Sequence, residues 1–208
     1  MLQGTIVELR NTGQALESKQ DTIRAFLALP VDISVVDRIH RASEILKTSI
    51  FPEARWVKPE HLHITLKFFA ELPEKTIPSI KNIMELCAEN MHRFTLEPTE
   101  LDAFPNKKFP KVIWLGVKSD TDDHKNLTTT IEKECSRLGF PMENKKDIPH
   151  ITMARIRNPQ PGKWPERDLI VKLFDKMPRF SVNSMKLIQS TLSSQGVRYK
   201  QLYEVFWD

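Results

Sequence analysis

The sequence predicts an α+β fold in which two pseudo-symmetric lobes of antiparallel strands form a central cleft, with helices on the outer faces. Two observations support this prediction. Strands and helices mix without strict alternation, which is typical of antiparallel sheets covered by helices on one face. A His-Ile-Thr segment also occurs twice, at His63 and at His150, and this indicates that the chain contains two related halves.

The first half of the chain is expected to contain two strands and two helices. Residues 23–29 (IRAFLAL) form an apolar run closed by a proline, which is typical of a buried strand. Apolar residues at helical spacing predict a helix over 32–47. A loop over 51–59 then leads to a strand over 61–69. The next helix is expected to start at a proline and to span 73–90.

The second half is expected to continue this mixture of strands and helices. We expect strands over 94–104, 111–117, 150–155, 180–192 and 197–206, and helices over 120–138 and 166–176. Gly139 stands where a helix C-cap commonly has glycine. Since no long linker separates the halves, we expect residues 22–208 to form a single bilobal domain after a polar N-terminal extension, residues 1–21.

The composition permits a nucleic acid partner but does not require one. The 208 residues carry a net charge of +4, which is moderately basic. No run approaches the roughly 20 apolar residues that cross a membrane, and residues 1–20 show no signal-peptide pattern, so we expect a cytoplasmic protein. Cys87 and Cys135 fit no metal-binding spacing and are expected to be buried, reduced thiols.

The repeated segments place a histidine and a threonine on one face of a strand. Side chains two residues apart in a strand share a face, so His63 and Thr65 point the same way, and so do His150 and Thr152. Strict alternation adds His61 and Lys67 to the face of His63, and assigns Leu62, Ile64, Leu66 and Phe68 to the apolar face. Equivalent strands of two related halves can lie side by side and present both pairs to one cleft.

Arg155 follows the second repeated segment. By strict alternation it belongs with Ile151 and Met153 on the apolar face. It stands at the end of the expected strand, however, where a β-bulge would turn its side chain toward the cleft. In that orientation its planar guanidinium would bind the same anionic oxygens as the threonine hydroxyls.

Two histidines in one cleft predict acid–base chemistry on a phosphate. Histidine exchanges protons near neutral pH, so one ring can act as general base and the other as general acid, each worth about 10²–10⁴-fold in rate. The threonines and Arg155 would stabilise negative charge that otherwise needs a metal ion. His61 and His63 are also spaced like a metal-binding pair, but no third ligand stands at a suitable spacing. With only 6 glycines and no Gly-rich loop, a nucleoside triphosphate site is not expected.

These segments resemble the 2H phosphoesterase superfamily, and within it the bacterial and archaeal RNA 2′,3′-cyclic phosphodiesterases, also called 2′-5′ RNA ligases. The resemblance covers most of residues 22–206. It rests on IRAFLALP (23–30), LHITLKFFAEL (62–72), VIWLGV (112–117), PHITMAR (149–155) and LIQSTLSSQGVRY (187–199). The twin His-x-Thr motifs are specific for the superfamily, and the trailing Arg155 and the last segment point to this branch.

The resemblance implies a role for each of these polar residues. His63 is similar to the proton donor for the leaving 3′ oxygen, and His150 is similar to the proton acceptor that activates water. Thr65, Thr152 and Arg155 resemble the phosphate-binding residues. The family forms a 2′-phosphomonoester without metal or ATP. In reverse, with an RNA 5′-hydroxyl in place of water, the same site joins RNA ends by a 2′-5′ bond.

The resemblance further implies a partner RNA with a 2′,3′-cyclic phosphate end, such as a tRNA half, and no cofactor. It gives Phe26 a contact with the nucleobase, although a core position for this ring stays open. Two other functions stay open as well. One is a phosphodiesterase for small cyclic nucleotide phosphates or 2′-5′ oligoadenylates, and the other is a non-catalytic module that binds RNA ends. We expect a monomer that does not contact a membrane.

Overall fold

The computed structural model describes residues 21–143, 148–194 and 196–208. The helices in this part of the chain are α1 (Ile33–Ser49), α2 (Ile77–Glu89), α3 (Asp123–Arg137) and α4 (Arg167–Phe174), with short 3-10 turns η1 (Pro59–His61) and η2 (Glu74–Thr76). The strands are β1 (Thr22–Pro30), β2 (Arg55–Trp56), β3 (His63–Pro73), β4 (Phe94–Phe104), β5 (Val112–Ser119), β6 (His150–Arg155), β7 (Phe180–Val182), β8 (Ser184–Ser193) and β9 (Gly196–Phe206). The expected N-terminal extension, residues 1–21, lies outside the described residues except for Asp21.

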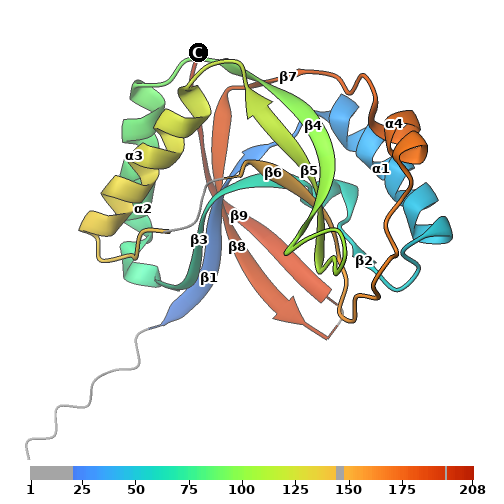
Figure 1. Ribbon diagram of the computed structural model, residues 1–208. Coiled ribbons are helices and arrows are strands. Elements are labelled where there is room, and N and C mark those ends of the chain that lie inside the picture. The colour runs from blue at the N-terminus through green and yellow to red at the C-terminus, as the bar shows by residue number, and fades with distance from the viewer. Residues whose placement is uncertain (1–20, 144–147, 195) are drawn as a thin grey trace, which may run out of the picture.

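All these strands belong to one curled antiparallel sheet (Figure 1). The strand order is β7-β4-β5-β6-β3-β1-β8-β9, and β2 pairs with β6. Helices α2 and α3 pack beside the lobe of β3, β1, β8 and β9, whereas α1 and α4 lie on the side of the other lobe. The predicted α+β fold with two antiparallel lobes and outer helices is confirmed, but the two lobes share a single continuous sheet.

Local sequence signals explain where several elements begin and end. The Asp32 carboxylate accepts a hydrogen bond from the Ser34 backbone N–H at 2.8 Å and caps α1, which satisfies an amide that the helix itself leaves unpaired. Gly139 follows α3 with a φ of 89°, a conformation that glycine adopts without a steric penalty. Residues 25–29 of β1 are buried because this strand lies between β3 and β8.

The structure differs from the sequence prediction at several points. The helix expected over 73–90 begins only at Ile77, after η2, because β3 continues to Pro73 by pairing with β1. The expected loop over 51–59 contains the two-residue strand β2, and the expected strand over 61–69 begins only at His63 because His61 belongs to η1. The expected strand over 180–192 is divided at Asn183. It is divided because β7 pairs with β4 in one lobe, whereas β8 pairs with β1 in the other. The chain therefore crosses between the lobes at this residue.

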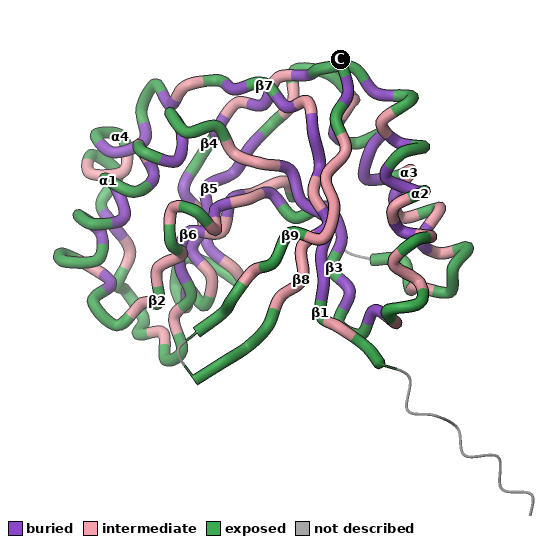
Figure 2. The backbone as a smooth tube through the Cα atoms, turned by 180° about the vertical axis from the view of Figure 1, so that it is seen from behind, coloured by how far each residue is buried: buried purple, intermediate pink, exposed green. Residues whose placement is uncertain are grey.

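The core lies between the sheet and the inner faces of the helices. Figure 2 shows buried backbone along the central strands, while the hairpin of β8 and β9 ends in exposed residues. Cys87 in α2 and Cys135 in α3 are buried and not disulfide-bonded, as predicted. Burial raises the pKa of Cys87 to about 11 and that of Cys135 to about 12. Across the described residues, the helices are too short or too polar to span a bilayer.

Candidate active site

The two His-Ile-Thr segments lie on neighbouring strands in the middle of the sheet. β3 and β6 are antiparallel, and Ile64 pairs with Ile151. Both isoleucines are fully buried, so the residues before and after them face the opposite side of the sheet. Because the strands run in opposite directions, His63 lies across from Thr152 and His150 lies across from Thr65. The prediction that the two segments lie side by side, with both histidines and both threonines on one face of the sheet, is therefore confirmed.

A β-bulge changes the alternation of side chains just after the first motif. Lys67 and Thr65 pair with consecutive residues of β1, so Leu66 is an extra residue in β3. The bulge turns Lys67 to the core side, where it is 2% exposed, and turns Phe68 to the cleft side, where it is 40% exposed. The predicted positions of Lys67, beside His63, and of Phe68, in the core, are therefore wrong, since one extra residue exchanges the two faces.

The second motif has a bulge at the equivalent position. Ala154 and Thr152 pair with consecutive residues of β5, so Met153 is the extra residue. The Val57 backbone N–H, next to β2, donates to the Met153 carbonyl oxygen at 2.8 Å, which holds the bulge in place. Ala154 is fully buried and Arg155 is exposed. Arg155 therefore lies on the same side of the sheet as Thr152. This is the orientation expected from the sequence if a bulge preceded Arg155.

The backbone fixes the protonation pattern of both histidine rings in the same way. His63 Nδ1 lies 2.7 Å from the His61 carbonyl oxygen, and His150 Nδ1 lies 2.7 Å from the Ile148 carbonyl oxygen. A carbonyl oxygen can only accept a hydrogen bond, so Nδ1 carries the proton in each ring. Nε2 is therefore the atom of each ring through which a proton could pass to or from a ligand.

Aromatic rings surround His63. Phe26 stacks on it with ring centroids 4.6 Å apart, and Tyr199 approaches its edge at 5.8 Å. Burial lowers the pKa of His63, against the hydrogen bond to the His61 carbonyl, which raises it. The charges of His150, His61 and, last, Arg155 lower this pKa further. Phe26 is only 3% exposed. Its ring lies on the same face of the sheet as His63 and has little surface left for a nucleobase, so its base contact stays a prediction.

His150 has an equivalent aromatic environment. Phe104 approaches its ring edge-on at 5.2 Å, and Trp114 lies at 5.6 Å. These two rings and Tyr199 were not predicted as parts of the site. The pairing of Trp114 with Thr152 places it there, and the sequence gives no indication of that register.

A cavity of about 670 Å³ opens next to His63. Its walls come from the end of β1, from η1 and from β8 and β9, and they include His61, Lys186, Tyr199 and Gln201. This volume is typical of a site for a small organic ligand. Among the described residues, no three His, Cys, Asp or Glu side chains cluster in a way that would bind a metal ion.

Comparisons with known proteins give the family. The model of the family described as LigT like Phosphoesterase matches the chain twice, over residues 30–114 and 115–199, so the two halves are related as the repeat predicted. A Methanothermobacter thermautotrophicus protein named RNA 2′,3′-cyclic phosphodiesterase is 30% identical, over 88% of this chain and 98% of its own length. A Thermotoga maritima protein of the same name is 32% identical, over 88% and 94%.

Solved structures show the same fold. A crystal structure of a Thermus thermophilus protein aligns with a TM-score of 0.76 at 23% identity and covers 88% of this chain and 97% of that one. Escherichia coli LigT complexed with 3′-AMP aligns with a TM-score of 0.67 at 20% identity, over 90% and 99%. From the doubled family match, these relatives and the paired motifs, the chain belongs to the LigT-like phosphoesterases, within the 2H phosphoesterase group.

Proposed function

We propose that this phosphoesterase hydrolyses RNA 2′,3′-cyclic phosphate ends to 2′-phosphomonoesters, with His63 as proton donor and His150 as proton acceptor. One observation carries the proposal. Two histidines with the same carbonyl-bound Nδ1 stand on adjacent strands and face one cleft. Such a pair suits a reaction that removes a proton from water and gives one to a leaving oxygen. The names of the relatives support RNA as substrate.

The threonines and Arg155 would bind the phosphate between the histidines. Each threonine lies across the strand pair from the histidine of the other motif, so one phosphate group can reach both hydroxyls. The charge of Arg155 contributes to the pKa of both His63 and Tyr199, which supports a position of this charge near His63. Fixed donors of this kind stabilise the charge that develops on phosphate oxygens in the transition state.

The cavity beside His63 supports the division of roles between the two histidines. When a 2′,3′-cyclic phosphate opens, the leaving 3′ oxygen stays attached to the ribose. The proton donor must therefore stand beside the terminal nucleoside, and the water must attack from the opposite side. A cavity of about 670 Å³ next to His63 can hold a nucleoside. His150 then stands on the side from which water attacks.

The direct test is hydrolysis of an RNA oligonucleotide with a 2′,3′-cyclic phosphate end in the presence of EDTA. We expect turnover with a 2′-phosphate as the product, because the proposed site uses no metal ion. No turnover, or turnover that requires a divalent cation, would contradict the proposal. With an RNA 5′-hydroxyl in place of water, the same arrangement would form a 2′-5′ bond, which gel analysis of joined ends detects.

Substrate comparison defines the class of RNA. We expect a higher kcat/KM for the oligonucleotide than for mononucleotide 2′,3′-cyclic phosphates or 2′-5′ oligoadenylates, with tRNA halves among the good substrates. An equal or higher kcat/KM for the small compounds would show that they, and not RNA ends, are the preferred substrates. Binding of RNA without any product would identify the chain as a module that holds RNA ends.

The pH dependence follows from the environment of His63. Burial lowers the pKa of this histidine from its usual value of 6.5, so its proton-donating form is lost early as pH rises. We expect kcat/KM, which reports the free enzyme, to fall on the alkaline side below that usual value. A bound phosphate anion favours the protonated ring, so the alkaline limb of kcat lies at higher pH. An alkaline limb of kcat/KM well above the usual histidine value would contradict His63 as the donor.

A further inference from the structure

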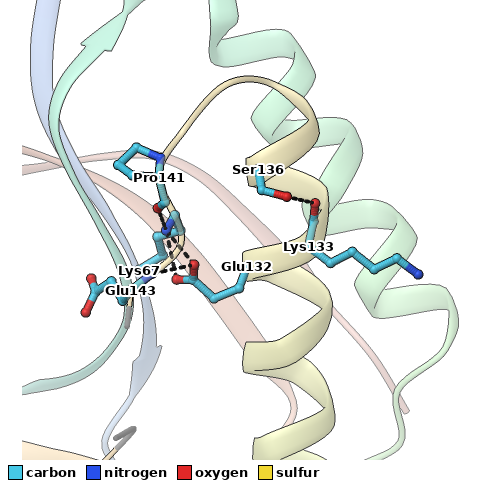
Figure 3. Close-up of polar contacts among 6 residues, drawn as sticks. All are labelled: Lys67, Glu132, Lys133, Ser136, Pro141 and Glu143. Carbon is cyan, nitrogen blue, oxygen red and sulfur yellow. Dashed lines mark hydrogen bonds and ion pairs between the residues drawn. The ribbon is translucent and has the colours of Figure 1, made fainter. Parts of the chain in front are cut away.

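Lys67 carries a charge into the interior of the lobe formed by β3, β1, β8 and β9. Its side chain is 2% exposed. The ammonium donates to both carboxylate oxygens of Glu132, at 2.8 and 2.9 Å, and to the Pro141 carbonyl oxygen at 3.0 Å (Figure 3). An ammonium group has three protons, and each of them has an acceptor here. This saturation is the condition under which a charge can remain buried.

Glu132 connects this lysine to a third part of the chain. It lies in α3, and its Oε2 also accepts the backbone N–H of Glu143 at 3.1 Å. The pair therefore binds the segment over 141–143 at two points, the Pro141 carbonyl and the Glu143 amide, as Figure 3 shows. β3, α3 and the chain that leaves α3 meet at a single ion pair.

The segment over 141–143, which Lys67 and Glu132 hold, precedes the second motif in the sequence. A few residues after it comes Ile148, whose carbonyl oxygen holds His150 Nδ1 at 2.7 Å. Lys67 stands two residues after Thr65 of the first motif, and it reaches the core only because the bulge at Leu66 turns it there. One buried interaction thus extends from the end of the first motif to the approach of the second.

Stability alone does not account for this pair. Replacing a buried ion pair by apolar residues of similar size is commonly neutral or stabilising. The other half of the chain has the fully buried Ala154 at the position equivalent to Lys67, so a bulge after the motif does not require a charge behind it. What distinguishes the pair is its hold on the segment over 141–143.

We propose that Lys67 and Glu132 are positioning residues: they hold the segment over 141–143, which precedes the second motif in the sequence, and thereby set the orientation of His150 relative to the first motif. This inference rests on the proposed function for its kinetic consequences. Its structural consequence, the orientation of the His150 ring, can be measured without a substrate. Neither residue lines the cavity beside His63, and we expect their replacement to act on the reaction through the position of His150.

The kinetic test uses Lys67→Met, Glu132→Gln and a matched control. We expect kcat on the cyclic phosphate oligonucleotide to fall by about 10–100-fold in both variants, because small displacements of catalytic groups have effects of this size. KM is expected to change by less than about threefold, because the phosphate contacts do not involve this pair. Lys133→Met removes the same charge from an exposed side chain that points away from the pair (Figure 3), and we expect wild-type kcat. A loss of kcat in the control equal to that in Lys67→Met would overturn the proposal.

A double variant separates positioning from stability. Lys67→Met with Glu132→Leu leaves no unpaired buried charge, so we expect thermal unfolding close to that of the wild type, with kcat still low. Nitrogen NMR of the histidine rings, without substrate, is expected to show the Nδ1–H form for both His63 and His150 in the wild type. In the double variant, we expect His150 to lose the Nδ1–H form and His63 to keep it. Wild-type kcat in the double variant would overturn the proposal. An unchanged Nδ1–H form of His150 in that variant would also overturn it, whatever substrate the wild type acts on.

Discussion

Alanine at either histidine is expected to lower kcat for the 2′,3′-cyclic phosphate oligonucleotide by about 10²–10⁴-fold. His63 and His150 are the groups that transfer protons in the proposed reaction, and both use Nε2 because Nδ1 is bound to a carbonyl oxygen. Steady-state kinetics with each single variant and with the double variant measure the effect. Groups that act as a unit are not additive, so the double variant is expected to lose about as much activity as the worse single variant.

The control for these variants is His40→Ala, which removes an exposed histidine from α1. It is expected to keep wild-type kinetics. A retained activity within tenfold of wild type in His63→Ala or His150→Ala would contradict the two-histidine mechanism. Unfolding curves of all variants exclude a loss of structure as the cause.

A substrate with an aryl leaving group distinguishes the acid from the base. A p-nitrophenolate ion departs without receiving a proton, so a nucleoside phosphodiester that releases it bypasses the general acid. We expect this substrate to restore most of the activity of His63→Ala and little of the activity of His150→Ala. The opposite result would exchange the two roles and would place the nucleoside on the side of His150.

Replacement of Arg155 has the second largest expected effect. Arg155→Met is expected to lower kcat/KM by about 10²–10³-fold, the usual cost of losing one fixed donor to developing negative charge. It also has a second consequence. Because the charge of Arg155 contributes to the lowered pKa of His63, its removal is expected to move the alkaline limb of kcat/KM to higher pH.

The matched control is Arg157→Met, an exposed arginine two residues after the end of β6. It removes the same charge from an exposed residue that lies outside β6. We expect a change of less than about threefold, as for a weak long-range attraction that salt screens. Equal losses in the two variants would show that Arg155 acts only through the overall charge of the protein.

Much of this site could be predicted because its main signal is a repeat. The bounds of β4 and β6 agree with the sequence prediction, and the doubled motif was sufficient to place both histidines on one face of adjacent strands. The bulge at Leu66 could not be seen, because Leu66 is an apolar residue like any other in a strand, whereas a bulge before Arg155 was considered only because that residue ends its strand. Lys67 was placed in the cleft for this reason, and its partner Glu132 lies 65 residues away in the chain.

The other missed features depend on contacts between distant segments. β2 is only two residues long and exists because β6 offers an open edge beside β3. The aromatic rings around the histidines come from β1, β4, β5 and β9, so their roles depend on the register of several strand pairs. Neither hydrophobic periodicity nor local motifs contain that information.

The equivalent bulges give each half of the chain one more residue that faces the cleft, five positions after its histidine. In one half this residue is Arg155, and in the other it is Phe68, with the Arg24 guanidinium 5.1 Å above its ring. A cleft with perfect twofold symmetry would bind a phosphodiester equally well in two opposite directions. Arg155 on one side, and the Phe68 ring with Arg24 above it on the other, make these directions unequal in free energy. The direction in which a phosphodiester would bind thus depends on the residues by which the two related halves of the chain differ.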